Sequence, residues 1–293
     1  MKKIFYLISF LSIVFSSCLR LDSNLYNSSK LTEYKLDNYQ DETDGDFRIP
    51  ASYDIPTDKI HLFSLTSGTY KIYAVYLGDI ADISTDTVIM YCHGNKNHID
   101  YYWQRAKLLA NIGSKNRFGV LMIDYRGFGL SEGKCTEEGL YEDVDAALAW
   151  LKQNGLTSDR LIMQGYSLGS APATKLTATP RSLIPSKLIL ESPFASAEVM
   201  VQDASVLAMP GSYLTSLEIN NAEEIKNIKQ PFLWIHGKAD SFLSIETHGE
   251  VVFKNYSGIK GVAYRIDGAN HADVPSIMGF SNYIKALEEF ITH

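Results

Sequence analysis

The residues best suited to chemistry lie in the stretch LIMQGYSLGSAPA, residues 161–173, where Ser167 stands between Gly165 and Gly169. An apolar run precedes the Gly-Tyr-Ser-Leu-Gly pentapeptide, and small residues follow it. A strand, a sharp turn and a helix in this order are typical of a nucleophile elbow, which exposes a serine hydroxyl at the carboxyl edge of a sheet. The pattern predicts that Ser167 is a nucleophile. The alternative is a loop serine that lies between two glycines.

A nucleophilic serine needs a base to take its proton and an acid to orient that base. In a fold with this elbow the acid and the histidine follow the serine in chain order, in loops after later strands. Asp240 follows the apolar run PFLWIHG, and His271 follows the next run, GVAYRID. The sequence therefore predicts a triad of Ser167, Asp240 and His271. Asp267 and Asp273, which flank the histidine, are the alternative acids.

Other histidines and one further acid near strand ends are predicted to serve the fold. His93 and His236 each belong to a His-Gly pair that closes a strand, and His248 is expected on a surface helix. Asp124 ends the strand before YRGFG and is expected to stabilise that turn. The role of His98 stays open, because its loop lies beside the proposed site.

Acyl transfer also needs N–H donors aimed at the carbonyl oxygen on which negative charge develops. Leu168 directly follows the nucleophile, and the loop CHGNKNH after the third strand supplies Asn95. In the elbow arrangement the two donors come from these two places. We expect the backbone N–H groups of Asn95 and Leu168 to form the oxyanion hole.

The elements that must position these residues alternate along the chain. Strand character is found at 59–78 (a hairpin), 87–95, 118–129, 160–169, 187–194, 230–240 and 261–271, and helical character at 100–112, 137–155 and 280–291. Apolar strands that alternate with helices predict an α/β fold with a mostly parallel sheet and helices on both faces. The interval 195–229 breaks the alternation and predicts a small helical lid.

The first residues have the pattern of a targeting segment. A basic start is followed by the apolar run IFYLISFLSIVF and by small residues, which predicts a signal peptide over residues 1–17. The run is shorter than the roughly 20 residues of a membrane span. Phe15-Ser16-Ser17-Cys18 resembles a bacterial lipobox in which Cys18 is lipidated, although Phe15 stands where an aliphatic residue is expected. The alternative is an ordinary secretory signal with an incidental cysteine.

The next residues, 18–46, are rich in Asn, Ser, Asp and Lys and predict a lipid-anchored flexible tether. The domain that carries the chemistry is then expected at 47–293. These features predict an exported lipoprotein attached to the bacterial cell envelope, or else a secreted or periplasmic protein.

Composition excludes some classes of function. The formal net charge of −7, without a Lys/Arg run, argues against nucleic acid as a partner. Beyond the leader the only cysteines are Cys92 and Cys135, which form neither a disulfide framework nor a metal-binding CxxC pair. They are expected to be small packed residues, with a disulfide between them as the alternative. No metal and no cofactor are predicted.

Taken together, CHGN, DYRGFGLSEG, GYSLG, ESPF, IHGKAD and GANH resemble the α/β-hydrolase superfamily, and most of all its bud-emergence-type and serine aminopeptidase-like branch. The resemblance spans about residues 50–292 and implies an eight-stranded α/β-hydrolase fold. It matches Ser167, Asp240 and His271 to nucleophile, acid and base. Members of this branch act on esters and thioesters of fatty acids, and a few relatives cleave peptides. The chain departs from the pattern at Lys96 and Asn97, where Ala-Gly is usual.

The predicted function is hydrolysis of small-molecule or lipid-like carboxylic esters through an acyl-enzyme, with membrane attachment through the N-terminal lipid. One alternative is an aminopeptidase or amidase on the same fold, which would need an acidic anchor for the substrate amine. The lid offers four candidates for this anchor: Asp203, Glu218, Glu223 and Glu224. The other alternative is a surface-binding lipoprotein without turnover.

Overall fold

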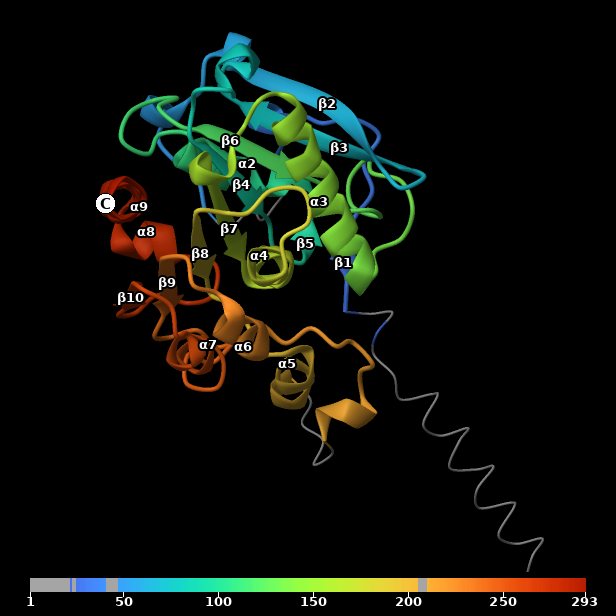
Figure 1. The fold of residues 1–293 in the computed structure, drawn as a ribbon, viewed down its shortest axis with the longest axis vertical. Helices are drawn as coiled ribbons and strands as arrows, with labels where there is room; N and C mark the ends of the chain where they lie inside the picture. Colours follow the sequence, from blue (N-terminus) through green and yellow to red (C-terminus); the bar gives the residue numbers. More distant parts are fainter. Residues whose placement is uncertain (1–21, 23–24, 41–46, 205–209) are drawn as a thin grey trace, which may run out of the picture.

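The computed structural model of the chain describes residues 22, 25–40, 47–204 and 210–293 (Figure 1). The predicted signal peptide, residues 1–17, and Cys18 lie outside these ranges. None of the helices within them combines the length and the hydropathy that crossing a membrane requires.

Eight strands form the central sheet, in the order β10-β9-β8-β7-β4-β6-β3-β2. The strands are β2 (Ile60–Ser67), β3 (Tyr70–Leu77), β4 (Val88–Cys92), β6 (Gly119–Ile123), β7 (Leu161–Tyr166), β8 (Lys187–Glu191), β9 (Phe232–Gly237) and β10 (Gly261–Ile266). β3 is antiparallel to both of its neighbours, β2 and β6, and all other neighbouring pairs are parallel. The predicted mostly parallel, eight-stranded sheet is confirmed.

Helices cover both faces of this sheet (Figure 1). One face is packed against α3 (Glu137–Gln153), α4 (Ser170–Ala178), α6 (Asn221–Glu224) and α7 (Gly249–Asn255). The other face is packed against α2 (Ile99–Leu109), α8 (Val274–Met278) and α9 (Phe280–Thr292). Side chains alternate between these two cores because successive strand residues point to opposite faces. In β4, Met90 joins the first core and Ile89 and Tyr91 join the second. This is the α/β-hydrolase architecture.

The interval between β8 and β9 contains short helices over the carboxyl edge of the sheet. They are α5 (Ala197–Ala204), the 3₁₀ turn η8 (Gly211–Tyr213), α6 and the 3₁₀ turn η9 (Ile225–Asn227). Asn221 ties this insertion to the body, because its side-chain amide donates to the carbonyl of Phe194 at 2.9 Å and to Ser170 Oγ at 3.0 Å.

The N-terminal segment is not a free tether in its described part, and the prediction is wrong for residues 25–40. Strand β1 (Asn27–Ser28) pairs in parallel with β5 (Lys96–Asn97), and further hydrogen bonds follow along the segment. Apolar residues at irregular spacing pack against the two cores, and they include Tyr26, Tyr34, Leu36 and Tyr39. Because these apolar residues do not recur with the period of a helix or a strand, only the polar composition of the segment was informative, and it indicated a tether.

Both cysteines of the body are packed residues, as the sequence predicts. Cys92, at the end of β4, and Cys135, just before α3, are buried free thiols. Burial raises the pKa of both thiols far above the ordinary range, which keeps them protonated.

Candidate functional site

Ser167 lies on a strained turn between β7 and α4. Its φ of 51° is in the left-handed region, which non-glycine residues rarely adopt. A Cβ at Gly165 would lie 2.5 Å from the carbonyl oxygen of Gly169, and a Cβ at Gly169 would lie 1.9 Å from that of Cys92. Both positions therefore require glycine for the turn to close. The predicted order of strand, sharp turn and helix around Ser167 is confirmed.

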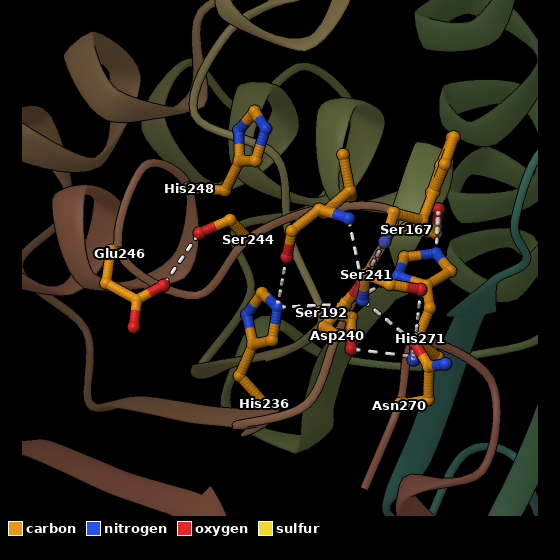
Figure 2. A network of polar contacts seen from close by, with 12 residues as sticks. Ser167, Ser192, His236, Asp240, Ser241, Ser244, Glu246, His248, Asn270 and His271 are labelled. Atoms are coloured by element: carbon orange, nitrogen blue, oxygen red, sulfur yellow. Dashed lines mark hydrogen bonds and ion pairs between the residues drawn. The ribbon is translucent and has the colours of Figure 1, made fainter. Parts of the chain in front are cut away.

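Three side chains form a hydrogen-bonded chain at the carboxyl edge of the sheet (Figure 2). His271, in the loop after β10, places Nε2 2.9 Å from Ser167 Oγ. Its Nδ1 lies 2.8 Å from Oδ2 of Asp240, in the loop after β9. An imidazole held in this way can take the proton of a serine hydroxyl while the carboxylate fixes its tautomer.

Asp240 is held as a carboxylate by four hydrogen-bond donors. Oδ2 accepts from His271 and from Nε2 of His236 at 3.0 Å. Oδ1 accepts from the backbone N–H groups of Phe242 at 2.9 Å and Leu243 at 2.8 Å. Burial raises the pKa of Asp240, but the hydrogen bonds from the two histidines outweigh it, so the pKa lies well below its usual range.

His236 has a part in this network that the sequence did not indicate. Trp234 donates its indole N–H to His236 Nδ1 at 3.3 Å, so the proton of the neutral ring is on Nε2 and points at Asp240. The ring is completely buried. His236 therefore supports the acid, beyond its predicted role in shaping the turn. The only sequence signal is its position four residues before Asp240.

The loop that carries His271 is fixed from three sides. The Tyr166 hydroxyl donates to the carbonyl of His271 at 3.3 Å, and Arg105 donates to the carbonyl of Ala272 at 2.7 Å. Asn270 links this loop to the acid loop, because its Oδ1 accepts from the backbone N–H of Ser241 at 3.0 Å. The imidazole is thereby positioned by the body of the protein.

The two alternative acids do not bind the imidazole. Asp273 accepts from the backbone N–H of Asn270 at 2.6 Å and so stabilises the turn of its own loop. Asp267 forms an ion pair with Lys238, and its side chain is 86% exposed. The geometry therefore selects Asp240 as the partner of His271.

Asp124, His93 and His98 belong to the fold around the neighbouring loop. Asp124 accepts from the backbone N–H of Ile99 at 2.8 Å and lies 3.3 Å from His93 Nε2. This agrees with the turn-stabilising role predicted for it. His98 is buried just before α2 and packs edge-on against Tyr39, with ring centroids 5.2 Å apart.

The expectation for His248 is wrong, because this residue is completely buried and not on a surface helix. It lies just before α7, where its ring points under the lid. Nδ1 accepts from the backbone N–H of Ala195 at 3.1 Å, and Nε2 lies 3.4 Å from Oδ2 of Asp203 in α5. Burial lowers the pKa of His248 to about 4, so the ring is neutral at pH 7.

Two chambers meet at Ser167. Asn95, Ser167 and Phe242 line both of them. The apolar chamber, with about 30 Å³ open to a water-sized sphere, lies under the lid and is lined further by residues that include Leu25, Tyr26, Leu168, Phe194, Met200 and Leu217. The polar chamber, with about 250 Å³ open to a water-sized sphere, is lined further by residues that include Asn27, Lys96, Tyr101, Tyr102, Tyr166 and His271.

Both residues expected to form the oxyanion hole line the apolar chamber, and Asn95 also lines the polar chamber. The side chain of Asn95 is turned away to the N-terminal segment, where it accepts from the backbone N–H of Asn27 at 3.0 Å and donates to the carbonyl of Leu25. Its backbone N–H is thus the group left for an oxyanion. Lys96 and Asn97, the departures from the family pattern, form β5 and pair with β1. The role of the Asn95 and Leu168 N–H groups stays a prediction.

Nothing in the site has the composition of a metal centre. In the described ranges, no three His, Cys, Asp or Glu side chains come together in a way that could hold a metal ion.

A family model described as serine aminopeptidase, S33, matches residues 83–226, a range that contains Ser167 and ends before Asp240 and His271. The human alpha/beta hydrolase domain-containing protein 17B is 28% identical over 207 residues, which are 70% of this chain and 66% of that protein. The matched region therefore spans just under two thirds of the length of that relative.

Solved structures share the fold at low identity. An esterase from Pyrococcus furiosus aligns with a TM-score of 0.68 at 18% identity, covering 92% of this chain and 97% of its own. Est1E from Butyrivibrio proteoclasticus, with ferulic acid bound, aligns with a TM-score of 0.63 at 18% identity, covering 78% and 98%. This chain therefore has the α/β-hydrolase fold, and its sequence is similar to the serine aminopeptidase family model and to the alpha/beta hydrolase domain-containing proteins over the ranges given above.

Proposed function

We propose that this chain is a serine hydrolase that cleaves carboxylic esters through an acyl-enzyme, with Ser167 as nucleophile, His271 as base and Asp240 as orienting acid. The observation that carries the proposal is the 2.9 Å contact between Ser167 Oγ and His271 Nε2, at the point where the two chambers meet. The esterase folds found among the structural neighbours support the same chemistry.

In the first half-reaction Ser167 Oγ attacks the ester carbonyl carbon and its proton passes to His271 Nε2. The carbonyl oxygen becomes negative and takes hydrogen bonds from the backbone N–H groups of Asn95 and Leu168. The tetrahedral intermediate then collapses, and His271 returns the proton to the alcohol that leaves. In the second half-reaction water attacks the acyl-enzyme with His271 again as base, which releases the acid and restores Ser167.

The two chambers support a proposal for where the two halves of the substrate bind. The general acid must lie beside the leaving oxygen, and His271 lines the polar chamber. The alcohol is therefore expected in the polar chamber, near Lys96 and the tyrosines. The acyl chain is expected in the apolar chamber, where aliphatic and aromatic side chains replace its contact with water. Thioesters of fatty acids fit the same arrangement.

An aminopeptidase is the second candidate, because the matching family model carries that description. Such an enzyme needs a carboxylate near the substrate amine. None of the four lid acids is among the residues that line the two chambers. Glu224 pairs with Lys175, Glu223 pairs with Lys226, and Asp203 binds Thr247. The polar chamber is lined by the cation Lys96, whose charge favours an ester over a substrate with a free amine.

Cys18 is proposed as the lipid anchor of an exported protein, on the strength of the sequence pattern alone. Asp22 contacts the lid at Thr215 and Ser216, next to the chamber residue Leu217. A four-residue chain spans at most roughly 14 Å. A lipid on Cys18 would therefore hold this side of the apolar chamber close to a membrane surface.

The proposal is tested by comparing p-nitrophenyl acyl esters with aminoacyl p-nitroanilides on the parent protein and on Ser167→Ala. We expect turnover of the esters, loss of turnover in the variant and slow or no cleavage of the anilides. Faster cleavage of aminoacyl anilides would favour the aminopeptidase. The absence of turnover on either series would support a binding protein instead.

A further inference from the structure

We propose that the N-terminal segment forms a wall of the substrate site and that Leu25 and Tyr26 determine which acyl chains fit. This segment, residues 22 and 25–40, is called the strap below. The inference rests on the proposed ester hydrolysis and specifies its substrate class as esters with an apolar acyl chain of limited length.

At its start the strap binds the lid. The carboxylate of Asp22 accepts from Thr215 Oγ1 at 2.7 Å and from the backbone N–H and hydroxyl of Ser216 at 2.9 and 2.5 Å. A carboxylate with three donors is held in one orientation. The strap is thus fixed to the insertion that covers the apolar chamber.

In the middle the strap binds the loop expected to supply an oxyanion donor. The Asn95 side chain bonds to the backbone of Leu25 and Asn27, on either side of Tyr26. β1 and β5 continue this contact, with Asn27 opposite Lys96 and Ser28 opposite Asn97. The two residues in which the HGN loop departs from the family pattern, Lys96 and Asn97, are thus the ones that pair with the strap.

Toward its end the strap binds the body. The backbone N–H of Leu31 donates to the carbonyl of Gly129 at 3.1 Å, and the Tyr34 hydroxyl donates to Asp124 at 2.6 Å. The backbone N–H groups of Lys35 and Leu36 donate to the two oxygens of Asp100 at 2.8 and 2.9 Å. Hydrogen bonds are therefore distributed along the length of the strap, which makes it a fixed part of the site.

The side chains of the strap change from apolar to polar where the two chambers meet. Leu25 and Tyr26 line the apolar chamber, together with Met200 and Leu217 of the lid, and Asn27 lines the polar chamber. The occupant of the apolar chamber is the acyl chain of the ester, because Ser167 opens into it and the described residues that line it include no charged side chain. The size of residues 25 and 26 should therefore limit acyl length.

The test measures kcat/KM for p-nitrophenyl acetate, butyrate, octanoate and laurate in the full chain. Leu25→Trp should fill part of the chamber and lower the octanoate-to-acetate ratio about tenfold or more, since one methylene in an apolar pocket changes discrimination by roughly 10- to 200-fold. The matched control is Leu31→Trp, which enlarges a leucine of the same strap outside the residues that line either chamber. It should leave the ratio within twofold.

A second pair of variants controls for the case in which Leu25→Trp displaces the strap. Tyr26→Ala should move the preferred acyl chain to greater length. Tyr26→Phe should leave it unchanged, because the Tyr26 hydroxyl is buried without a hydrogen-bond partner among the described residues.

The outcomes separate the two proposals. If the dependence of kcat/KM on acyl length is unchanged in both Leu25→Trp and Tyr26→Ala, with acetate still hydrolysed, the proposed role of the strap is overturned. Ester hydrolysis itself is left intact by that result. A parent protein that hydrolyses none of the esters would overturn the proposed function itself.

Discussion

Replacement of Asp240 by asparagine tests how the acid controls the base. The structure gives this carboxylate four donors: His271 and His236 on Oδ2, and two backbone N–H groups on Oδ1. An asparagine has one oxygen to accept and one NH₂ that can only donate. If its oxygen faces the backbone, its NH₂ faces the two imidazoles. His271 must then turn Nδ1 into an acceptor and carry its proton on Nε2, toward Ser167.

In that tautomer His271 cannot take the serine proton. We expect kcat/KM for an ester to fall by about 10³- to 10⁴-fold, which corresponds to about 4–5 kcal/mol of transition-state stabilisation. The opposite amide orientation would leave two backbone N–H groups facing a donor, at a cost of about 1–3 kcal/mol for each buried unsatisfied group. A loss of thermal stability would reveal that second outcome.

The assay is hydrolysis of p-nitrophenyl butyrate together with a thermal melt, and Asp273→Asn is the control. In the part of the chain that the structure describes, Asp273 Oδ1 accepts from the backbone N–H of Asn270, which an asparagine oxygen can also do, so activity should stay within a few-fold. A loss of less than tenfold in Asp240→Asn, with the melting point unchanged, would refute the assignment of Asp240 as the orienting acid.

Three further changes test the surroundings of the site. Gly169→Ala should destabilise the fold by about 1–3 kcal/mol in chemical denaturation, because its Cβ would lie 1.9 Å from the carbonyl oxygen of Cys92; unaltered stability would contradict the closed elbow. His236→Leu should lower kcat about tenfold with KM unchanged, since Asp240 loses a hydrogen bond of about 1.5–3 kcal/mol; a rise in KM alone would contradict this. The buried His248 has its pKa lowered from about 6.5 to about 4, so the unfolded chain binds the extra proton between these values. Stability should be full above pH 6.5 and fall by about 3 kcal/mol as the pH drops to 4, and His248→Asn should flatten that slope in melts recorded against pH.

Much of the fold could be predicted because its signals are local. Apolar runs of strand length, the amphipathic helix at 137–153 and the glycines around Ser167 each reflect a nearby steric or packing demand. The order of serine, acid and histidine then placed all three at one sheet edge, since the carboxyl ends of parallel strands meet there. The contact between His271 and Asp240 follows from that topology.

What the sequence did not indicate depends on contacts between distant segments. The strap binds residues 64 to 194 positions away along the chain, such as Asn95, Asp100 and Ser216, whereas its own composition indicates a polar coil. His248 was expected on a surface helix, whereas it lies at the buried start of α7 beneath α5. The bond from His236 to Asp240 depends on the indole of Trp234, which no spacing reveals.

The most direct test of the central claim is labelling with a fluorophosphonate, with the adduct located by mass spectrometry. The parent protein, Ser167→Ala and His271→Ala are compared under identical conditions. A nucleophile activated by the 2.9 Å contact with His271 predicts an adduct on Ser167, none in Ser167→Ala and much slower labelling in His271→Ala. A well-folded parent protein that forms no adduct, or that labels equally fast without His271, would contradict the account.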